Sequence, residues 1–257
     1  MDNKFFELIE KVKEVGKSNL NYFNQVLEFE EKLDACDLKS KADMEADKML
    51  VDYIQELFPS YSIYSEEQGK ILKDTEYMFV IDPLDGTNNF ALGIPLFTTN
   101  ISLLKENEII FGLVHNPITD KTYYAYKGEG AFENNTKIKV NKIDDISKST
   151  ISFTTGYINP KDIAIKRVAD IGRLLPKRLV TFWAPGNDFC LLASGKIEAV
   201  INENKETYDF SAGKLIAKEA GAMITDFNNL PSGDNDDAYF VASNGTKIHQ
   251  EILQIFK

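Results

Sequence analysis

The second half of the chain alternates short apolar runs, of the length of strands, with longer runs whose apolar residues recur at helical spacing. Strands are predicted over 150–154, 179–183, 197–201, 223–225 and 238–241, and helices over 162–175, 187–194, 210–219 and 247–256. Strands that alternate with helices bury the faces of a sheet under layers of helices. The pattern therefore predicts an α/β layer arrangement.

The first half is predicted to hold two helices before its strands. The first covers 5–15 and breaks at Gly16, and the second starts at Asp43 as its N-cap and ends at Phe58-Pro59. Between them, the polar and charge-rich segment 28–41 is predicted to be a loop. The N-terminal third is therefore expected to contribute a helical layer.

Five further runs in the first half have the composition of strands. They are 61–64, 77–81, 98–104, 109–114 and 122–126, of which the last three are expected to pair antiparallel. The polar stretch 141–149 follows them and separates two predicted subdomains, 1–142 and 143–257.

Charge limits what the chain can bind. The 257 residues carry 29 Lys and Arg against 40 Asp and Glu, a formal net charge of −11. This argues against direct nucleic-acid binding, in which Lys and Arg neutralise phosphates.

No apolar run approaches the roughly 18 residues of a membrane span, and residues 1–10 lack the basic and then apolar order of a signal peptide. We expect a cytoplasmic globular protein that does not associate with membranes.

Cysteine and histidine are scarce. Cys36 and Cys190 are too few and too far apart for a disulfide scaffold or a zinc site, and His115 and His249 are too few for a histidine-rich metal site. The chemistry must therefore rest on carboxylates. An acidic chain repels anionic substrates unless something inverts the local charge.

The segment 82–90, Asp-Pro-Leu-Asp-Gly-Thr-Asn-Asn-Phe, carries the most specific chemical signal. An apolar strand delivers Asp82 and Asp85 onto a turn, and Pro83 is expected to end the strand because it cannot extend a hydrogen-bond ladder. The Gly-Thr pair that follows can open a short helix whose free N–H groups favour an anion. Carboxylates next to amides that bind an anion would repel that anion unless Mg²⁺ ions lie between them. Two such ions can stabilise both the attacking and the leaving oxygen when a phosphate ester is hydrolysed.

This segment resembles, at every position, the first signature of the inositol monophosphatase family, D-P-[ILD]-D-G-T-x-[NS]-F. A second family element is a pair of glutamates after a short strand, here Glu66-Glu67, and a third is a C-terminal motif, here residues 208–222. The stretches 112–117 and 127–132 look like the family's hairpin. The resemblance extends from about residue 32 to residue 224, in the family's order.

The resemblance implies a layered αβαβα sandwich of the sugar-phosphatase type, with an α+β N-terminal half and an α/β C-terminal half. It implies hydrolysis of a small phosphate monoester with two or three Mg²⁺ ions, a homodimer, and inhibition by Li⁺. The N-terminal half would carry most metal ligands, and the C-terminal half would carry the last ligand and the wall that determines specificity.

The resemblance also assigns residues to roles. Metal ligands would be the side chains of Glu66, Asp82, Asp85 and Asp209 and the backbone carbonyl of Leu84. The substrate would contact Asp85, Gly86, Thr87 and Asp209, with the amides of Gly86 and Thr87 on the phosphate oxygens. Water activated by the metal would attack phosphorus directly, with no covalent enzyme intermediate.

Catalysis is assigned to Glu66, Thr87 and Asp43. Thr87 with Glu66 would orient and deprotonate the attacking water, and Asp43 would position the Thr87 hydroxyl. The resemblance further places Glu67 near a weaker metal site and Lys32 on a mobile loop. Whether the segment 28–41 closes over the site is left open.

Departures from the family pattern concern the alcohol half of the substrate. The run 183–186, Trp-Ala-Pro-Gly, stands where members that act on inositol phosphates tend to carry G-[ST]-A-A, and Tyr208 replaces the usual tryptophan. Asn202 replaces a glutamate that contacts the sugar ring, although Glu203 and Glu206 are close by. Inositol monophosphate or a related polyol or sugar phosphate is the expected substrate. Fructose 1,6-bisphosphate, 3′-phosphoadenosine 5′-phosphate and NADP(H) stay open, as does a non-catalytic role as a partner of RNA machinery.

Three features outside the motifs are interpreted as structural. His115 is expected to be a hairpin side chain, and Trp183 to belong to the core or to a pocket wall. The acidic run 234–237 is expected to be a solvated turn, because the glycine and the terminal glutamate of an EF-hand are missing.

Overall fold

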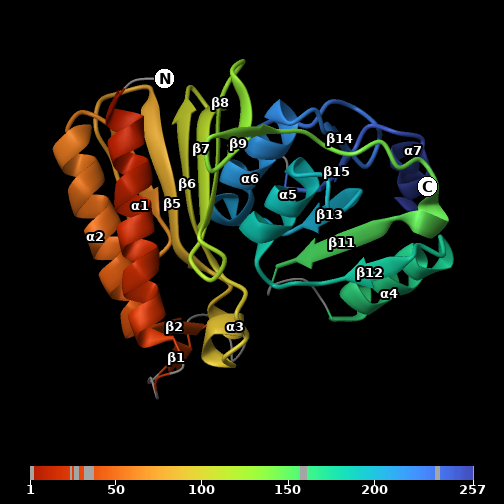
Figure 1. Ribbon diagram of the computed structural model, residues 1–257, viewed down its shortest axis with the longest axis horizontal. Coiled ribbons are helices and arrows are strands. Elements are labelled where there is room, and N and C mark those ends of the chain that lie inside the picture. Colours follow the sequence, from red (N-terminus) through yellow and green to blue (C-terminus); the bar gives the residue numbers. More distant parts are fainter. Residues whose placement is uncertain are drawn as a thin grey trace.

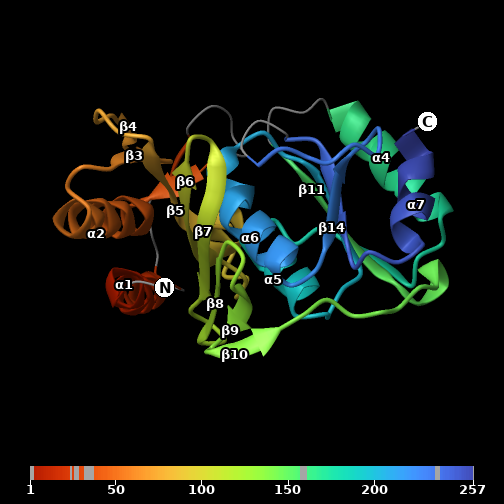
Figure 2. The ribbon, with the colours of Figure 1, turned by 90° about the horizontal axis from the view of Figure 1, so that it is seen from above.

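The computed structural model describes residues 3–23, 25, 29–31, 38–156, 161–234 and 238–256. These residues form five layers, alternately helical and stranded (Figure 1). In order they are helices α1 (Asn3–Tyr22) and α2 (Lys41–Leu57), an eight-stranded sheet, helices α5 (Pro185–Ala193) and α6 (Thr207–Glu219), a five-stranded sheet, and helices α4 (Lys161–Arg173) and α7 (Ile248–Leu253). Figure 2 shows α5 and α6 between the two sheets. The predicted αβαβα sandwich is confirmed.

The first sheet is antiparallel except for one parallel pair, β3 with β5. Its strands, in spatial order, are β10 (Thr136–Ile138), β9 (Gly130–Glu133), β8 (Lys121–Tyr126), β7 (Glu108–Asn116), β6 (Thr98–Lys105), β5 (Tyr77–Asp85), β3 (Ser62–Ser65) and β4 (Gly69–Ile71). The predicted antiparallel set is present as β6, β7 and β8. His115 lies on β7, as expected of a hairpin side chain.

The second sheet mixes parallel and antiparallel pairs. Its order is β12 (Arg178–Val180), β11 (Thr150–Thr155), β13 (Ala199–Glu203), β15 (Phe240–Ser243) and β14 (Met223–Asp226). The shorter elements are β1 (Phe29–Glu31), β2 (Leu38–Ser40), α3 (Thr87–Ala91) and the 3₁₀ turns η1 (Ile146–Lys148) and η2 (Gln254–Phe256). The two sheets lie on either side of the predicted subdomain boundary at 142–143, which itself stays a prediction.

Two predictions for the N-terminal third are wrong. Helix α1 continues through Gly16 instead of breaking there, because Gly16 packs on β7: a Cβ at this position would lie 2.6 Å from Cδ2 of the buried His115. The segment 28–41 is not only loop, since β1 and β2 pair antiparallel at its ends and α2 already begins at Lys41. Lys32 and Cys36 lie outside the described residues.

The N-cap of α2 is Ser40 and not Asp43. Ser40 accepts a hydrogen bond from the Ala42 amide at 3.1 Å, while Asp43 Oδ2 accepts one from the Ser40 amide at 2.8 Å. This reciprocal pair is a capping box, in which the acid stands three residues after the cap. Asp43 is therefore inside the first turn of α2, and its side chain points back toward the start of the helix.

Helix α6 packs closely on both of its neighbours because of small residues. A Cβ at Gly112 on β7 would lie 2.5 Å from the Ala212 carbonyl oxygen, and a Cβ at Gly213 would lie 2.6 Å from Phe189 Cβ on α5. Ser102 on β6 and Ser211 on α6 share a hydrogen bond of 2.7 Å in this interface. Gly112 therefore allows α6 to approach the first sheet at Ala212, and Gly213 allows it to approach α5.

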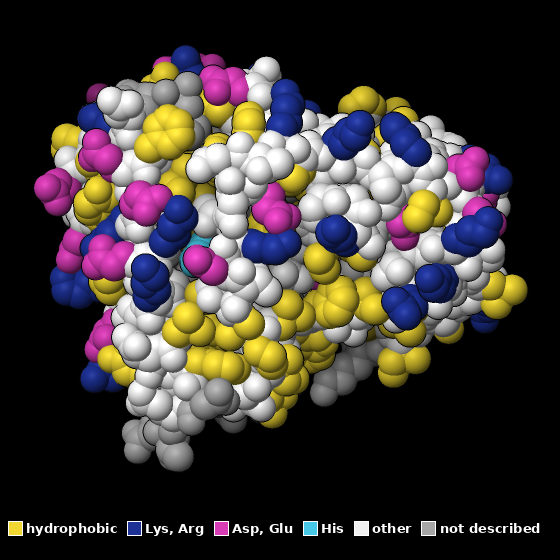
Figure 3. Space-filling model, in the orientation of Figure 1, with side chains coloured by type: hydrophobic (Ala, Val, Ile, Leu, Met, Phe, Trp, Pro, Cys, Tyr) yellow, Lys and Arg dark blue, Asp and Glu magenta, His cyan; other side chains and the backbone are white. Residues whose placement is uncertain are grey.

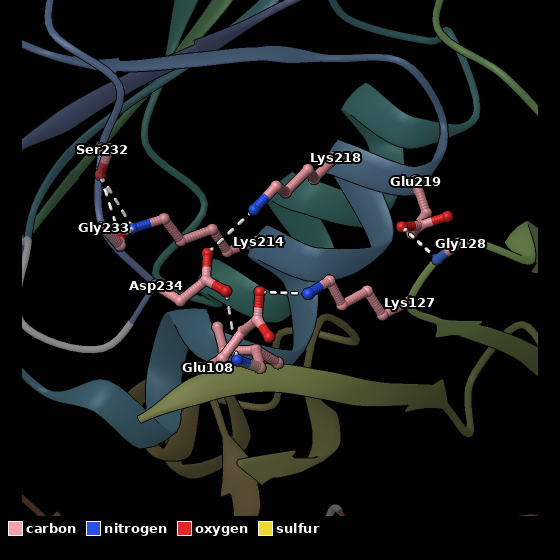
Figure 4. A network of polar contacts seen from close by, with 10 residues as sticks. Glu108, Lys127, Gly128, Lys214, Lys218, Glu219, Ser232, Gly233 and Asp234 are labelled. Carbon is pink, nitrogen blue, oxygen red and sulfur yellow. Dashed lines mark hydrogen bonds and ion pairs between the residues drawn. The ribbon is translucent and has the colours of Figure 1, made fainter. Parts of the chain in front are cut away.

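Polar contacts hold the C-terminal half of α6 (Figure 4). Glu219 accepts hydrogen bonds from the amides of Gly128 at 2.8 Å and Gly130 at 2.9 Å, in the β8–β9 turn. The buried Lys214 donates to Ser232 Oγ at 2.9 Å in the connection between β14 and β15. These contacts join the C-terminal half of α6 to both sheets.

The helices of the described residues are too short or too polar to span a membrane.

Candidate metal and phosphate site

The parallel pairing of β3 with β5 brings the first two acidic residues together. Ser65 is opposite Ile81 in the register, and the Glu66 amide donates to the Ile81 carbonyl at 3.0 Å, so that Glu66 leaves β3 beside Asp82. Asp82 is 1% exposed. Burial, and next the negative charges of Glu66, Asp85 and Asp209, raise the pKa of Asp82 well above its ordinary value.

Strand β5 does not end at Pro83, contrary to the expectation. The strand continues to Asp85, and its register against β6 shifts between Asp82, which is opposite Asn100, and Asp85, which is opposite Thr98. Such an irregularity accommodates a proline because the bulged residue needs no ladder donor. It also aims both aspartates at one end of the sheet.

Asp85 is held by three donors from two other segments. Its Oδ2 accepts hydrogen bonds from Thr98 Oγ1 at 2.9 Å, Asn100 Nδ2 at 3.1 Å and the Gly186 amide at 2.7 Å. Burial nevertheless dominates, and it raises the pKa of Asp85 to about 7 against the lowering effect of these donors. At Gly186 a Cβ would lie 2.4 Å from Asn100 Oδ1, so that only glycine brings its amide this close.

Asp209 enters the cluster from the first turn of α6. Asn204, just after β13, donates from Nδ2 to Asp209 Oδ2. Burial, and then the charge of Asp85, raise the pKa of Asp209 to about 8. The structure thus brings Glu66, Asp82, Asp85 and Asp209 within electrostatic reach of one another, from three different elements.

Thr87 lies at the other side of the same turn and is 7% exposed. Its Oγ1 is 3.1 Å from Asp43 Oδ1 and 3.0 Å from the Leu84 carbonyl oxygen. The predicted short helix is α3, and its N-cap is Gly86 with φ of 93°. A side chain at Gly86 would crowd the Leu96 carbonyl oxygen at 3.0 Å, so this turn requires glycine for both conformation and space.

Sequence reasoning missed the groups that hold the acidic cluster. Thr98, Asn100 and Gly186 contact Asp85, and Asn204 contacts Asp209, yet none of them stands in the recognised motifs. A signal did exist for two of them. Thr98, Asn100 and Ser102 stand two residues apart along β6, so that one face of this strand carries three polar side chains.

The residues expected to meet the alcohol are arranged differently from the family pattern. Asn202 donates to the carbonyl oxygens of Asn204 at 2.9 Å and Ala238 at 2.6 Å, and Glu203 is paired with Arg167 at 2.6 Å. Glu206 is the N-cap of α6 and makes no side-chain cap hydrogen bond there. Its charge raises the pKa values of Tyr64, Tyr208 and Asp209, so its carboxylate lies near the cluster.

Two further expectations concern the edge of the site. Trp183 is 54% exposed, so it is not a core residue; its carbonyl oxygen, however, would lie 3.3 Å from a Cβ at Gly86. Glu67 follows Glu66 in the same turn, and its amide donates to Ser65 Oγ at 3.3 Å. Residues 235–237 of the acidic run lie outside the described part of the chain.

The donor set fits a hard divalent cation. Carboxylates gather at this end of the sheet, and burial is the main cause of the raised pKa values of Asp82, Asp85 and Asp209. Neighbouring carboxylate charges of the cluster raise the pKa values of Asp82 and Asp209 further. Among the described residues, no group of three or more His, Cys, Asp or Glu side chains is placed so that it could by itself hold a metal ion. Mg²⁺ commonly takes only one or two carboxylates in a protein and completes its shell with water and substrate phosphate.

Comparisons with known proteins agree with this geometry. A model of the inositol monophosphatase family, whose members are generally metal-dependent, matches residues 2–257. A fructose-1,6-bisphosphatase/inositol-1-monophosphatase of Thermotoga maritima is 29% identical over 256 residues, which cover 96% of this chain and 93% of the relative. A Nus factor SuhB of Vibrio cholerae is 31% identical over 222 residues, 80% of either chain.

Solved structures give the same answer for the fold. The Thermotoga maritima IMPase matches with a TM-score of 0.88 and 28% identity, over 99% of this chain and 96% of that one. The chain belongs to the inositol monophosphatase family and is a phosphomonoester hydrolase.

Proposed function

We propose that this chain hydrolyses a small phosphate monoester with Mg²⁺ bound by Glu66, Asp82, Asp85 and Asp209. The observation that carries the proposal is the gathering of these carboxylates at one end of β5, where burial raises the pKa values of Asp82, Asp85 and Asp209. Such a cluster costs free energy unless protons or cations neutralise it. Divalent cations turn the same cluster into a site with positive potential, to which a phosphate binds.

The proposed ligand set also includes the backbone carbonyl of Leu84. This oxygen accepts a hydrogen bond from Thr87 Oγ1 at 3.0 Å, and its second lone pair is enough to ligate an ion. We propose two or three ions, with Glu67 beside the weakest. When bound, the ions lower the pKa of water and neutralise charge on the phosphate oxygens.

The chain's own residues orient the attacking water. Thr87 Oγ1 donates its hydrogen to Asp43 or to the Leu84 carbonyl, which leaves lone pairs that accept a hydrogen bond from water. One water hydrogen then points at Thr87, and its lone pair is free to point at phosphorus. Glu66 accepts the proton that the water loses. Asp43 acts through Thr87 and does not touch the substrate.

The amides of Gly86 and Thr87 hold the phosphate oxygens in this proposal. Gly86, with φ of 93°, is the N-cap of α3, and the first amides of a helix have no hydrogen-bond partners inside it. Asp85 and Asp209 contact the substrate from either side. Phosphoryl transfer requires mainly positioning and charge neutralisation, which such an arrangement supplies.

For the substrate we propose inositol monophosphate or a related polyol or sugar phosphate. Fructose 1,6-bisphosphate is the first alternative, which the double name of the Thermotoga maritima relative supports. NADP(H) and 3′-phosphoadenosine 5′-phosphate are the others. Because Asn202 and Glu203 are engaged elsewhere, Glu206 is the remaining carboxylate that hydroxyl groups of the alcohol can reach.

We propose a homodimer formed through apolar residues next to the site. Leu92 is 76% exposed and Ile94 is 42% exposed, and both follow α3. The exposed Trp183 lies near them, because Asn89 Nδ2 donates to the carbonyl oxygens of both Leu96 and Phe182. Figure 3 shows hydrophobic side chains gathered over α3. Exposed apolar patches of this kind mark contact surfaces.

We propose the cytoplasm as the compartment of this protein. The thiol of Cys190 is buried, and the cytoplasm keeps such thiols reduced.

Phosphate release from a panel of inositol, sugar and nucleotide monoesters tests the proposal, with Mg²⁺, with EDTA and with Li⁺. We expect release with Mg²⁺ only, inhibition by Li⁺, and a loss of roughly 100-fold or more in kcat/KM for Asp85→Asn, because a metal ligand supplies several kcal/mol to the transition state. Asp74→Asn, which makes the same charge change at an exposed position, is the matched control. Turnover in EDTA, or an Asp85→Asn variant as active as wild type, contradicts the assignment.

A non-catalytic role with RNA machinery is the second candidate. The Vibrio cholerae relative named Nus factor SuhB favours it. With a net charge of −11 this chain would act through a protein partner and not through direct RNA contact. A protein that binds Mg²⁺ but releases phosphate from no member of the panel would favour this role.

A further inference from the structure

Helix α2 presents a second buried carboxylate, one turn after Asp43. Asp47 is 0% exposed, as is Asp43, and both side chains lie on the face of α2 that covers the first sheet. Asp43 contacts Thr87. Asp47 instead accepts hydrogen bonds from Ser65 Oγ and, at 2.7 Å, from Gln68 Nε2. The motifs of the sequence do not include Asp47.

The two donors to Asp47 stand at either end of the turn that carries Glu66 and Glu67. Ser65 Oγ gives its hydrogen to Asp47 and accepts, in turn, from the amides of Glu67 at 3.3 Å and Gln68 at 3.4 Å. The turn is thus bonded to α2 through Asp47. On its other side the Glu66 amide donates to the Ile81 carbonyl of β5 at 3.0 Å.

Asp47 accepts one hydrogen bond on each carboxylate oxygen, from Ser65 and from Gln68, and hydrogen bonds to an ionised acceptor are stronger than neutral ones. An asparagine would accept from Ser65 through a neutral oxygen, and it would reach Gln68 only after the Gln68 amide had turned over. An acid at position 47 therefore ties the turn to α2 more firmly than the corresponding amide would.

We propose that Asp47 is a positioning residue for the metal site: it fixes the turn 65–68, so that the carboxylate of Glu66 faces Asp82 and holds a divalent cation. This inference rests on the proposed function, because it assumes that Glu66 is a metal ligand. Helix α2 then contributes two residues to the site. Asp43 contacts Thr87, and Asp47 holds the turn that carries Glu66.

Cation binding tests the inference without any substrate. Free Mn²⁺ is counted by electron paramagnetic resonance during titration of the metal-free protein. Asp47→Asn is expected to weaken binding by about tenfold, which is the range for groups that orient metal ligands. Ser65→Ala breaks the same link from the turn and should weaken binding in the same direction, even if Asp47→Asn does not fold. Asp52→Asn, at an exposed position on the same helix that pairs with Lys48, is the matched control and should bind as wild type does.

A second measurement separates positioning from a general loss of structure. In a Glu66→Gln background the effect of Asp47→Asn on Mn²⁺ affinity should largely disappear, because Asp47 acts through Glu66. An equal loss in both backgrounds overturns the inference, and so does unchanged affinity in Asp47→Asn and Ser65→Ala while wild type binds Mn²⁺. If wild type itself binds no divalent cation, the proposed function fails first, which distinguishes the two failures.

Discussion

At the scale of single residues, several buried carboxylates lie outside the cluster at the end of β5, and Asp188 is one of them. Asp188 on α5 is 1% exposed and accepts hydrogen bonds from Ser152 at 2.7 Å and Thr154 at 3.4 Å, both on β11. Its other oxygen, Oδ1, has no partner among the described residues. Burial, partly offset by these donors, raises the pKa of Asp188 to about 7.

The raised pKa of Asp188 predicts a pH-dependent stability difference. The native state keeps this proton up to about pH 7, while the unfolded state loses it near pH 4, so ionisation opposes folding increasingly as the pH rises between these values. Asp188→Asn removes the effect. Its free energy of unfolding relative to wild type should rise by about 1.4 kcal/mol per pH unit in this window and stay constant above it.

Urea denaturation of both proteins from pH 4.5 to 8.5, read as a difference, checks the Asp188 prediction. The buried His115 and His249, whose pKa values burial lowers to about 4, titrate in both proteins and cancel. A difference between variant and wild type that does not change with pH would contradict the account of Asp188.

Individual residues of the site could be predicted where a local motif contains them. Asp82, Asp85 and the short helix after them follow from nine adjacent residues, and the structure has α3 at the expected place. Gly186 and Asn204 could not be predicted, because each is recruited by a contact between segments distant in sequence, 101 residues apart for Gly186 and Asp85. No local periodicity encodes such a contact.

At the scale of elements, the helices were predictable in kind but not at their ends. The break expected at Gly16 illustrates the reason: glycine weakens a helix by about 1 kcal/mol in isolation, but here it allows α1 to approach β7. Ser40 illustrates a different reason, because Ser40 and Asp43 have the spacing of a capping box, a local signal that the sequence does contain. A tertiary contact decides the position of Gly16, and a local cap decides the start of α2.

Gly16→Ala should therefore destabilise the protein by about 1–3 kcal/mol, even though alanine favours helix. The added methyl would meet His115 Cδ2 at 2.6 Å and Nε2 at 2.9 Å, and this ring is 1% exposed. The matched control is Gly172→Ala on α4, where a Cβ meets nothing within 4 Å. It should stabilise by up to about 1 kcal/mol, because alanine is the better helix former.

Urea midpoints of the two glycine variants measure this directly. Destabilisation of Gly16→Ala together with a neutral or positive effect of Gly172→Ala supports close packing of α1 on β7. A Gly16→Ala variant as stable as Gly172→Ala would show that the contact with His115 is not tight.

At the scale of the whole molecule, an α/β layer arrangement followed from the alternation of strands and helices, and the αβαβα order followed from the resemblance to the family. Neither predicted how closely neighbouring layers pack. Glycine residues determine the packing distance: Gly112 allows α6 to approach the first sheet, and Gly213 allows it to approach α5. This approach sets where Asp209 stands relative to β5. The sequence motif contains the Ala-Gly pair of α6, whereas its partner Gly112 lies on a strand about a hundred residues earlier.

The net charge of the whole chain also affects how the protein can bind phosphate. The chain carries −11 overall, and its acidic cluster repels phosphate while it lacks cations. Two Mg²⁺ ions would take the net charge from −11 to −7 and would reverse the sign of the potential at one place only. The central claim of the account is therefore that this protein binds phosphate through metal ions and not without them.

Calorimetric titration with inorganic phosphate, in EDTA and in millimolar Mg²⁺, tests that claim most directly. The account predicts saturable binding of one phosphate per chain in Mg²⁺, none in EDTA, and none in either buffer for Asp85→Asn. Equal binding of phosphate in EDTA and in Mg²⁺ would contradict it.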